Sequence, residues 1–271
     1  MAATREPDAD GRRFGANNRT DSAGQPWAGR SLHHHDNPYA NDDGTTPAIY
    51  AEAVAAFRAG TAGLEAVAAA VMQSRLLIPL IAEAGDLGVT PEGRTVDKTQ
   101  ELSIVTVQGP DGRTVLPAFT SADAMSAWDP KARPIPADGR RVALAAADDG
   151  ATAIVLNPGT PEVLGLRRPA IWAIAQGQDW TPADRDPDVL AEFAALAADE
   201  PVITRVALHA GDPRATLETP EVIVTLGLVP GLSQDDVQDL VARQAKAWSA
   251  SDLITDRVDS LTIRLEAVDL A

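Results

Sequence analysis

Apolar residues recur along this chain at two different spacings, one typical of helices and one typical of strands. In residues 49–57 and 64–73 they fall every three or four positions, which predicts two amphipathic helices, with Gly60 ending the first. Residues 76–82 are instead one continuous apolar run that contains Pro79. This run is too short for a typical helix, so it predicts a strand that is buried on both faces and irregular at the proline.

A hairpin pattern follows. Residues 102–107 and 114–119 have the composition of strands, and the turn formers Gln-Gly-Pro-Asp-Gly-Arg separate them. This arrangement predicts two antiparallel strands joined by a reversal of the chain. Thr120 or Ser121 can then cap a short helix, whereas the three prolines of residues 129–136 keep that segment extended.

Helical and strand patterns continue to alternate in the rest of the chain. The clearest helix signal is Ser233, with Asp236 in a capping-box position and Leu232 placed to contact Val237. Its predicted buried stripe is Val237, Leu240, Val241, Ala245 and Trp248. The other predicted elements are a helix at 140–149 ending at Gly150, a strand at 151–156, a helix at 189–198, and strands at 202–209, 221–228 and 261–268.

These patterns predict an α+β protein of two small domains, each a mixed or antiparallel sheet packed by helices, after a disordered N-terminal arm. Asp, Pro and Gly accumulate between residues 177 and 187, where the apolar periodicity lapses and a domain boundary is expected. The predicted divisions are an arm at 1–44, an α/β domain at 45–180 and an α+β domain at 187–271. In the polar arm, Trp27 is an exception, because a large aromatic residue there often docks onto the folded body or a partner.

Charge and composition narrow the class of partner. The formal net charge is -16 and the sequence pI is about 4.5, so the surface repels phosphate backbones and nucleic acid is not an expected partner. The chain has no cysteine, which excludes disulfides and thiolate chemistry. The N-terminus lacks the apolar core of a secretory signal and the purest apolar run is too short to span a bilayer, so we expect a soluble cytoplasmic protein without a membrane partner.

Motifs that carry chemistry are weak. His33, His34 and His35 beside Asp36 offer metal ligands, but adjacent residues in a flexible arm do not converge on a rigid site, and adventitious metal binding is the expected interpretation. The sequence contains no GxxxxGK[ST] or GxGxxG motif and no Gly-x-Ser-x-Gly setting for a serine nucleophile. We therefore expect no catalytic residues, no cofactor and no metal.

Asp42 and Asp43 precede Gly44 and form part of a calcium-loop pattern. The full alternation of oxygen ligands and the distant glutamate are missing, so a turn before the first helix is the expected structure.

Polar and aromatic residues near the predicted hairpin and its proline segment are the candidate binding residues. Two roles remain open for them. A pair such as Asp97 or Asp129 with Arg133 clamps the loop, or Arg and Trp side chains on an extended proline segment form a binding edge. With the arm residue included, the candidate interaction surface is Trp27, Lys98, Arg113, Trp128, Arg133 and Pro134.

Several segments resemble one known family. They are DSAGQPWAGR at 21–30, NDDG at 41–44, VDK at 96–98 and LPAFTSADAMSAWDPKARPIP at 116–136, followed by RVALHA, PGLSQDDV and LTIRLEAV in the second half. Together they resemble actinobacterial members of the SseB ("enhanced serine sensitivity") family, with SseB N-terminal and C-terminal domains. The resemblance implies a cytoplasmic two-domain protein with no catalytic residue set to transfer. The three adjacent histidines are a departure from the family pattern.

The function expected from the sequence is that of a non-enzymatic interaction or regulatory protein, which contacts an unknown protein partner through residues 128–136 together with the Trp27 arm. The alternative is a sensor of an amino acid or related metabolite, or an enzyme, with a site assembled from residues far apart in the sequence. A homodimer formed through an exposed sheet edge is compatible with both.

Overall fold

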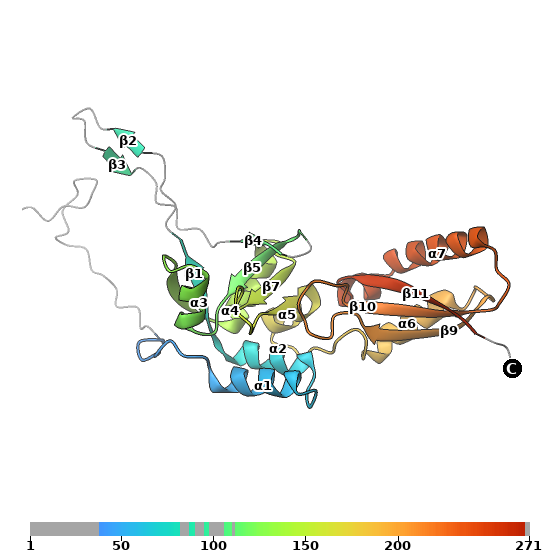
Figure 1. Cartoon of the computed structure of the whole chain (residues 1–271), viewed down its shortest axis with the longest axis horizontal. Helices are drawn as coiled ribbons and strands as arrows, with labels where there is room; N and C mark the ends of the chain where they lie inside the picture. The colour runs from blue at the N-terminus through green and yellow to red at the C-terminus, as the bar shows by residue number, and fades with distance from the viewer. Residues whose placement is uncertain (1–37, 82–86, 90–94, 98–105, 110–111, 269–271) are drawn as a thin grey trace, which may run out of the picture. The chain divides into compact units, whose positions relative to one another are not determined.

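The computed structural model describes residues 38–81, 87–89, 95–97, 106–109 and 112–268 (Figure 1). Asp42–Ala271 forms one compact unit, in which apolar side chains gather around two main sheets. The fold is α+β, as the sequence predicts. No helix among the described residues is both long and apolar enough to cross a membrane.

Two predicted helices begin this unit. They are α1 (Ala48–Arg58) and α2 (Leu64–Gln73), and they bury Tyr50 and Val54 from α1 against Val67 and Val71 from α2. Gly60 has a φ of 71°, a left-handed conformation that glycine adopts without a steric penalty. This residue ends the first helix where the sequence places its stop.

The apolar run and the proline segment pair with each other as strands. β1 (Arg75–Leu80) confirms the predicted buried strand, and β6 (Arg133–Asp138) lies antiparallel to it with Ile78 opposite Ile135. The sequence predicted that residues 129–136 are extended but did not predict this pairing.

Prolines limit the pairing of β1 with the strand that ends beside Phe119. Leu77 exchanges both backbone hydrogen bonds with Phe119, at 2.7 and 2.9 Å. Continuing that antiparallel bridge by two residues would place Pro79 opposite Pro117, and neither residue has an N–H to donate. The ladder between β1 and the strand that ends beside Phe119 therefore stops after one bridge.

A four-stranded mixed sheet follows, in the order β4-β5-β7-β8. The β4–β5 pair confirms the described part of the predicted hairpin, whose residues 102–105 lie outside the described residues. β5 and β7 are parallel, and β7 and β8 are antiparallel. The strands are β4 (Val107–Gln108), β5 (Thr114–Ala118), β7 (Ala153–Leu156) and β8 (Leu164–Arg167), and a separate antiparallel pair consists of β2 (Leu87–Val89) and β3 (Thr95–Asp97).

Three helices accompany this sheet: α3 (Ala122–Trp128), α4 (Gly139–Asp148) and α5 (Arg168–Gln176). Ser121 caps α3 by accepting a hydrogen bond from the Ala124 N–H, as predicted. The sequence analysis missed β8 and α5, although Pro169 at the start of α5 and Gly177 at its left-handed C-cap are ordinary helix signals. Helices α1, α2, α4 and α5 share one core on one face of the sheet.

A buried polar pair joins the end of β5 to the end of β7. Asn157 has a φ of 50°, and its side-chain oxygen accepts a hydrogen bond from the Thr120 N–H at 2.9 Å. Its amide nitrogen donates to the Thr120 hydroxyl at 3.0 Å. Both residues are 1% exposed, so each hydrogen bond replaces one that water would otherwise make.

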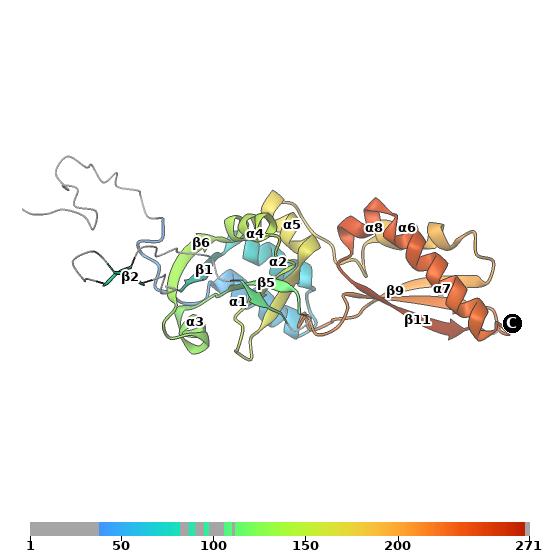
Figure 2. The same cartoon turned by 90° about the horizontal axis from the view of Figure 1, so that it is seen from above.

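The second sheet has β10 in its centre, antiparallel to β9 and parallel to β11. Helices α6, α7 and α8 pack against one face of it and share one apolar core (Figure 2). Phe193 and Trp248 meet there edge to face, with ring centroids 5.1 Å apart. The elements are α6 (Pro187–Ala197), β9 (Ile203–Ala210), β10 (Val222–Leu228), α7 (Gln234–Ser249), α8 (Asp252–Arg257) and β11 (Leu261–Ala267), of which the sequence analysis missed α8.

Helix α7 has the predicted capping box between Ser233 and Asp236. Its buried stripe differs at one position from the prediction. Gln244 is buried, whereas Ala245 is exposed. The Gln244 amide nitrogen donates to the Leu196 carbonyl at 3.4 Å, which satisfies part of this buried polar side chain.

Thr120→Val tests the buried pair, because valine has the shape of threonine but cannot accept from Asn157. We expect a loss of about 1–3 kcal/mol in the free energy of unfolding, since a buried amide N–H loses its partner. Urea denaturation measures it, and Thr120→Ser, which keeps the hydroxyl, is the control. A valine variant as stable as the serine variant would contradict this account.

Candidate functional site

The six predicted binding residues do not form one surface among the described residues. Trp27 and Lys98 lie outside the described residues, as do His33–His35 and Asp36. Arg113 lies at the end of the hairpin turn, where it binds a carboxylate from the second half of the chain. Trp128, Arg133 and Pro134 lie in α3 and β6.

Trp128 is an anchor for α3. Its ring packs against Phe119 with centroids 5.3 Å apart and planes inclined by 43°, and the side chain is half-buried in a small cluster with Leu77 and Met125. The cluster fixes α3 over the end of β1. The structure therefore gives Trp128 an architectural contact.

Arg133, Pro134 and Ile135 are all exposed at the start of β6, and we call them the ribbon surface. Arg133 makes no hydrogen bond or ion pair within the described part of the chain. The structure does not contain the clamp between Asp129 and Arg133 among its described residues, where Asp129 accepts the Lys131 N–H at 2.8 Å. The side chain of Asp97 lies outside the described residues.

Asp42 and Asp43 form the expected turn. Asp42 forms an ion pair with Arg75 at 2.5 Å, and Asp43 accepts from the backbone and hydroxyl of Thr45. The hydrogen bonds from Thr45 lower the pKa of Asp43. Within the described ranges, no group of three His, Cys, Asp or Glu residues is placed to hold a metal ion.

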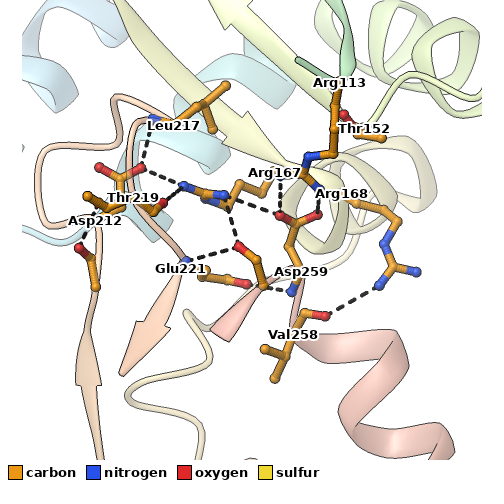
Figure 3. A network of polar contacts seen from close by, with 12 residues as sticks. Arg113, Thr152, Arg167, Arg168, Asp212, Leu217, Thr219, Glu221, Val258 and Asp259 are labelled. Atoms are coloured by element: carbon orange, nitrogen blue, oxygen red, sulfur yellow. Dashed lines mark hydrogen bonds and ion pairs between the residues drawn. The ribbon is translucent and has the colours of Figure 1, made fainter. Parts of the chain in front are cut away.

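A charged network connects β8 with the loops around the second sheet (Figure 3). Arg167, the last residue of β8, donates to Asp212 at 2.8 Å, to Asp259 at 3.2 Å and to the Thr219 carbonyl at 2.6 Å. Arg113 binds the same Asp259 carboxylate with two hydrogen bonds, at 3.1 and 2.8 Å. The fork of each guanidinium matches these planar acceptors.

This network is largely removed from water. The Arg167, Asp212 and Asp259 side chains are 7%, 5% and 2% exposed. A buried charge without an oppositely charged partner is costly where water is excluded. The charge of each residue in the network is therefore balanced by the charges of the others. The Arg113 side chain is 33% exposed, so it covers the network from the outside.

Asp212 shapes the 212–219 loop, whose Leu217 packs with Val115, Ala153 and Val155 on the face of the first sheet opposite the main helices. Its carboxylate accepts from the N–H groups of Thr216 and Leu217. Leu217 then covers Gly165 so closely that a Cβ there would lie 2.3 Å from the Leu217 Cγ. Arg167 therefore holds this loop against β8 through Asp212.

A cleft of about 520 Å³ lies beside Arg167. Its walls come from four segments: the α1–α2 connection, β8, residues 180–185 and the chain from the end of β9 to the start of β10. Phe57 and Trp180 supply aromatic surface, and Glu65 with Arg185 forms an exposed ion pair in the wall. This combination of apolar area and a few charged groups is typical of small-molecule sites.

Glu221 is the carboxylate of this cleft whose proton affinity is most changed. Burial raises the pKa of Glu221 to about 7, and the negative charges of Asp259 and Asp184 also raise it. The hydrogen bond from the Asp259 N–H and the positive charge of Arg167 lower it. One side-chain oxygen, Oε2, accepts the Asp259 N–H at 2.6 Å. The other, Oε1, has no hydrogen-bond partner among the described residues.

Comparison with protein families bears on the first half of this structure. Residues 51–173 match the model of the SseB protein N-terminal domain. This confirms the SseB N-terminal resemblance of that part of the chain. Neither the curated proteins nor the solved structures contain a match.

The SseB match contains the ribbon surface, Arg113 and Arg167, whereas Asp212, Glu221 and Asp259 lie beyond it. The network thus joins the SseB-matching region to the rest of the chain. Sequence reasoning found Arg113 but not the other members. Arg167 lies 45 residues from Asp212 and 92 from Asp259, so no local motif marks their contact.

Arg167→Met tests the network, because methionine fills similar space without a charge. We expect a loss of about 3–5 kcal/mol in the free energy of unfolding, since Asp212 is left buried without its cation. The control is Arg205→Met, which removes an exposed pair with Glu266 and should cost less than about 1 kcal/mol. Urea denaturation measures both, and equal losses would contradict the assignment.

Glu221 makes stability depend on pH. Its pKa rises from 4.5 in the unfolded chain to about 7 in the folded protein, so the folded state binds the proton more tightly. Its contribution to stability therefore falls as pH rises from about 4.5 to about 7, by on the order of 3 kcal/mol, and stays low above that.

Glu221→Gln should remove this part of the slope and stabilise the protein at pH 8 relative to the native chain. Denaturation at pH 5, 7 and 8 measures the difference between the two proteins. Glu52→Gln, at an exposed position of α1, serves as the control. A wild-type slope retained in Glu221→Gln would show that another group is responsible.

Proposed function

We propose that this chain is a non-enzymatic, cytoplasmic interaction or regulatory protein of the SseB family, which acts by contacting another protein. The SseB match over residues 51–173 supports the family. The finer assignment, to the actinobacterial type with an SseB C-terminal domain after residue 187, belongs to the proposal. So does the exclusion of nucleic acid as a partner, which follows from the acidic composition, and of membranes, which follows from the shortness of the apolar runs.

The observation that carries this proposal is the exposure of the ribbon surface. Ile135 is 43% exposed beside Arg133, which has no ion pair with any described residue, and the strand that holds both is anchored through β1. An arginine next to an apolar side chain on a rigid element is a common composition for the centre of a protein interface.

The backbone of β6 indicates how a partner would be recognised. Alternate residues of an antiparallel strand direct their backbone groups toward the partner strand. The Gly139 N–H donates to the Ser74 carbonyl, so residues 133, 135 and 137 also face β1. Residues 134 and 136 direct their backbone groups to the open edge. The outward residues 134 and 136, next to the ribbon surface, are prolines and cannot donate. A partner is therefore bound through side chains rather than by adding a strand to this edge.

The pair of substitutions Arg133→Ala and Ile135→Ser tests this surface, because both residues are exposed and the fold should be retained. A photo-crosslinking residue at position 134 in the native cell should capture a specific partner. The double variant should reduce that product by tenfold or more, measured by quantitative mass spectrometry.

Leu144→Ser with Arg205→Ala is the matched control, since Leu144 is 59% exposed and Arg205 also lies at the surface, both outside the ribbon surface. Equal crosslinking in native and double-variant proteins would contradict the proposal. Capture of a second copy of the chain alone would replace it with a homodimer interface.

A further inference from the structure

The described residues that line the cleft beside Arg167 include more carboxylates than cations. Its two cations are already engaged: Arg167 binds Asp212 and Asp259, and Arg185 binds Glu65. Two further carboxylates, Glu221 and Asp184, also line the cleft.

Among the described residues, neither of these carboxylates has a cationic partner within 3.5 Å of its oxygens. Asp184 lies 3.9 Å from the Arg185 Nε, a long ion pair whose cation also binds Glu65 at 3.1 Å. Glu221 has only the Asp259 N–H on one oxygen, and its Oε1 is without a partner in the described part of the chain. Glu221 and Asp184 are also close enough to repel each other, which is one cause of the raised pKa of Glu221.

The aromatic rings of Phe57 and Trp180 lie in the same walls. An aromatic face attracts a cation and also covers the apolar body of an organic molecule. The volume of about 520 Å³ is within the range of metabolite-sized ligand sites.

We propose that this cleft binds a small organic cation, whose primary ammonium donates hydrogen bonds to Glu221 and Asp184 while its apolar body lies against Phe57 and Trp180. The inference concerns a surface separate from the ribbon surface and does not depend on it. A divalent metal is a poorer fit, because the described residues offer no group of three ligands. An anion is a poorer fit because both cations already bind carboxylates.

Pentylamine is a suitable probe, with 1-pentanol and pentanoate as neutral and anionic analogues of the same length. Calorimetric titration of the full chain at pH 8 should show saturable binding of pentylamine and at least tenfold weaker binding of both analogues. Glu221→Gln should weaken pentylamine binding by about tenfold or more, and Asp184→Asn should weaken it as well. The control Glu52→Gln should bind within twofold of the native protein.

The pH dependence gives a second readout. Glu221 accepts from an ammonium only when ionised, so pentylamine should bind more tightly at pH 8 than at pH 6, with proton release near pH 7. The other titratable and charged groups of the cleft are Glu65, Asp184, Arg185, Asp212 and Arg167, with Asp259 behind Glu221. The difference between the two pH values should disappear in Glu221→Gln.

Three results would each overturn the inference. They are the absence of saturable pentylamine binding, equal binding of 1-pentanol, and unchanged binding in Glu221→Gln. None of them affects crosslinking at the ribbon surface, so the two proposals can fail separately.

Discussion

The buried guanidinium of Arg167 is the interaction on which the arrangement around the second face of the first sheet depends. It ends β8, and it compensates the carboxylates of Asp212 and Asp259 where little water reaches them. Through Asp212 it holds the 212–219 loop, so that Leu217 can cover Gly165. The same arginine lines the cleft and lowers the proton affinity of Glu221. Arg167 therefore contributes to the packing of the loop, to the balance of buried charge and to the candidate ligand site.

Proline imposes the second constraint, because it removes backbone donors at chosen positions. Pro79 and Pro117 stop the ladder between β1 and β5 after one bridge, and Pro134 and Pro136 occupy two of the outward positions of β6. Open strand edges invite unwanted pairing, and a proline-blocked edge prevents it. The proline-rich motif of the SseB-matching region is thus explained partly by architecture, and its exposed side chains form the proposed interaction surface.

The ribbon surface and the cleft differ in the kind of partner that they fit. The ribbon surface is open and presents one cation beside an apolar side chain, whereas the cleft is concave, aromatic and rich in carboxylates. A regulatory protein can use one surface for a ligand and another for a protein partner. Coupling between them would require a difference in affinity between two states of the protein.

The sequence by itself determined most of the local elements. Patterns of apolar residues located α1, α2, β1 and β10, and the Ser233–Asp236 pair located the start of α7, because helix caps and burial patterns depend on residues a few positions apart. Only the tertiary structure decided that Gln244 faces inward, that Arg113 meets Asp259 across 146 positions, and that burial raises the pKa of Glu221 to about 7. These properties arise from contacts and burial between distant segments, which no short stretch of sequence encodes.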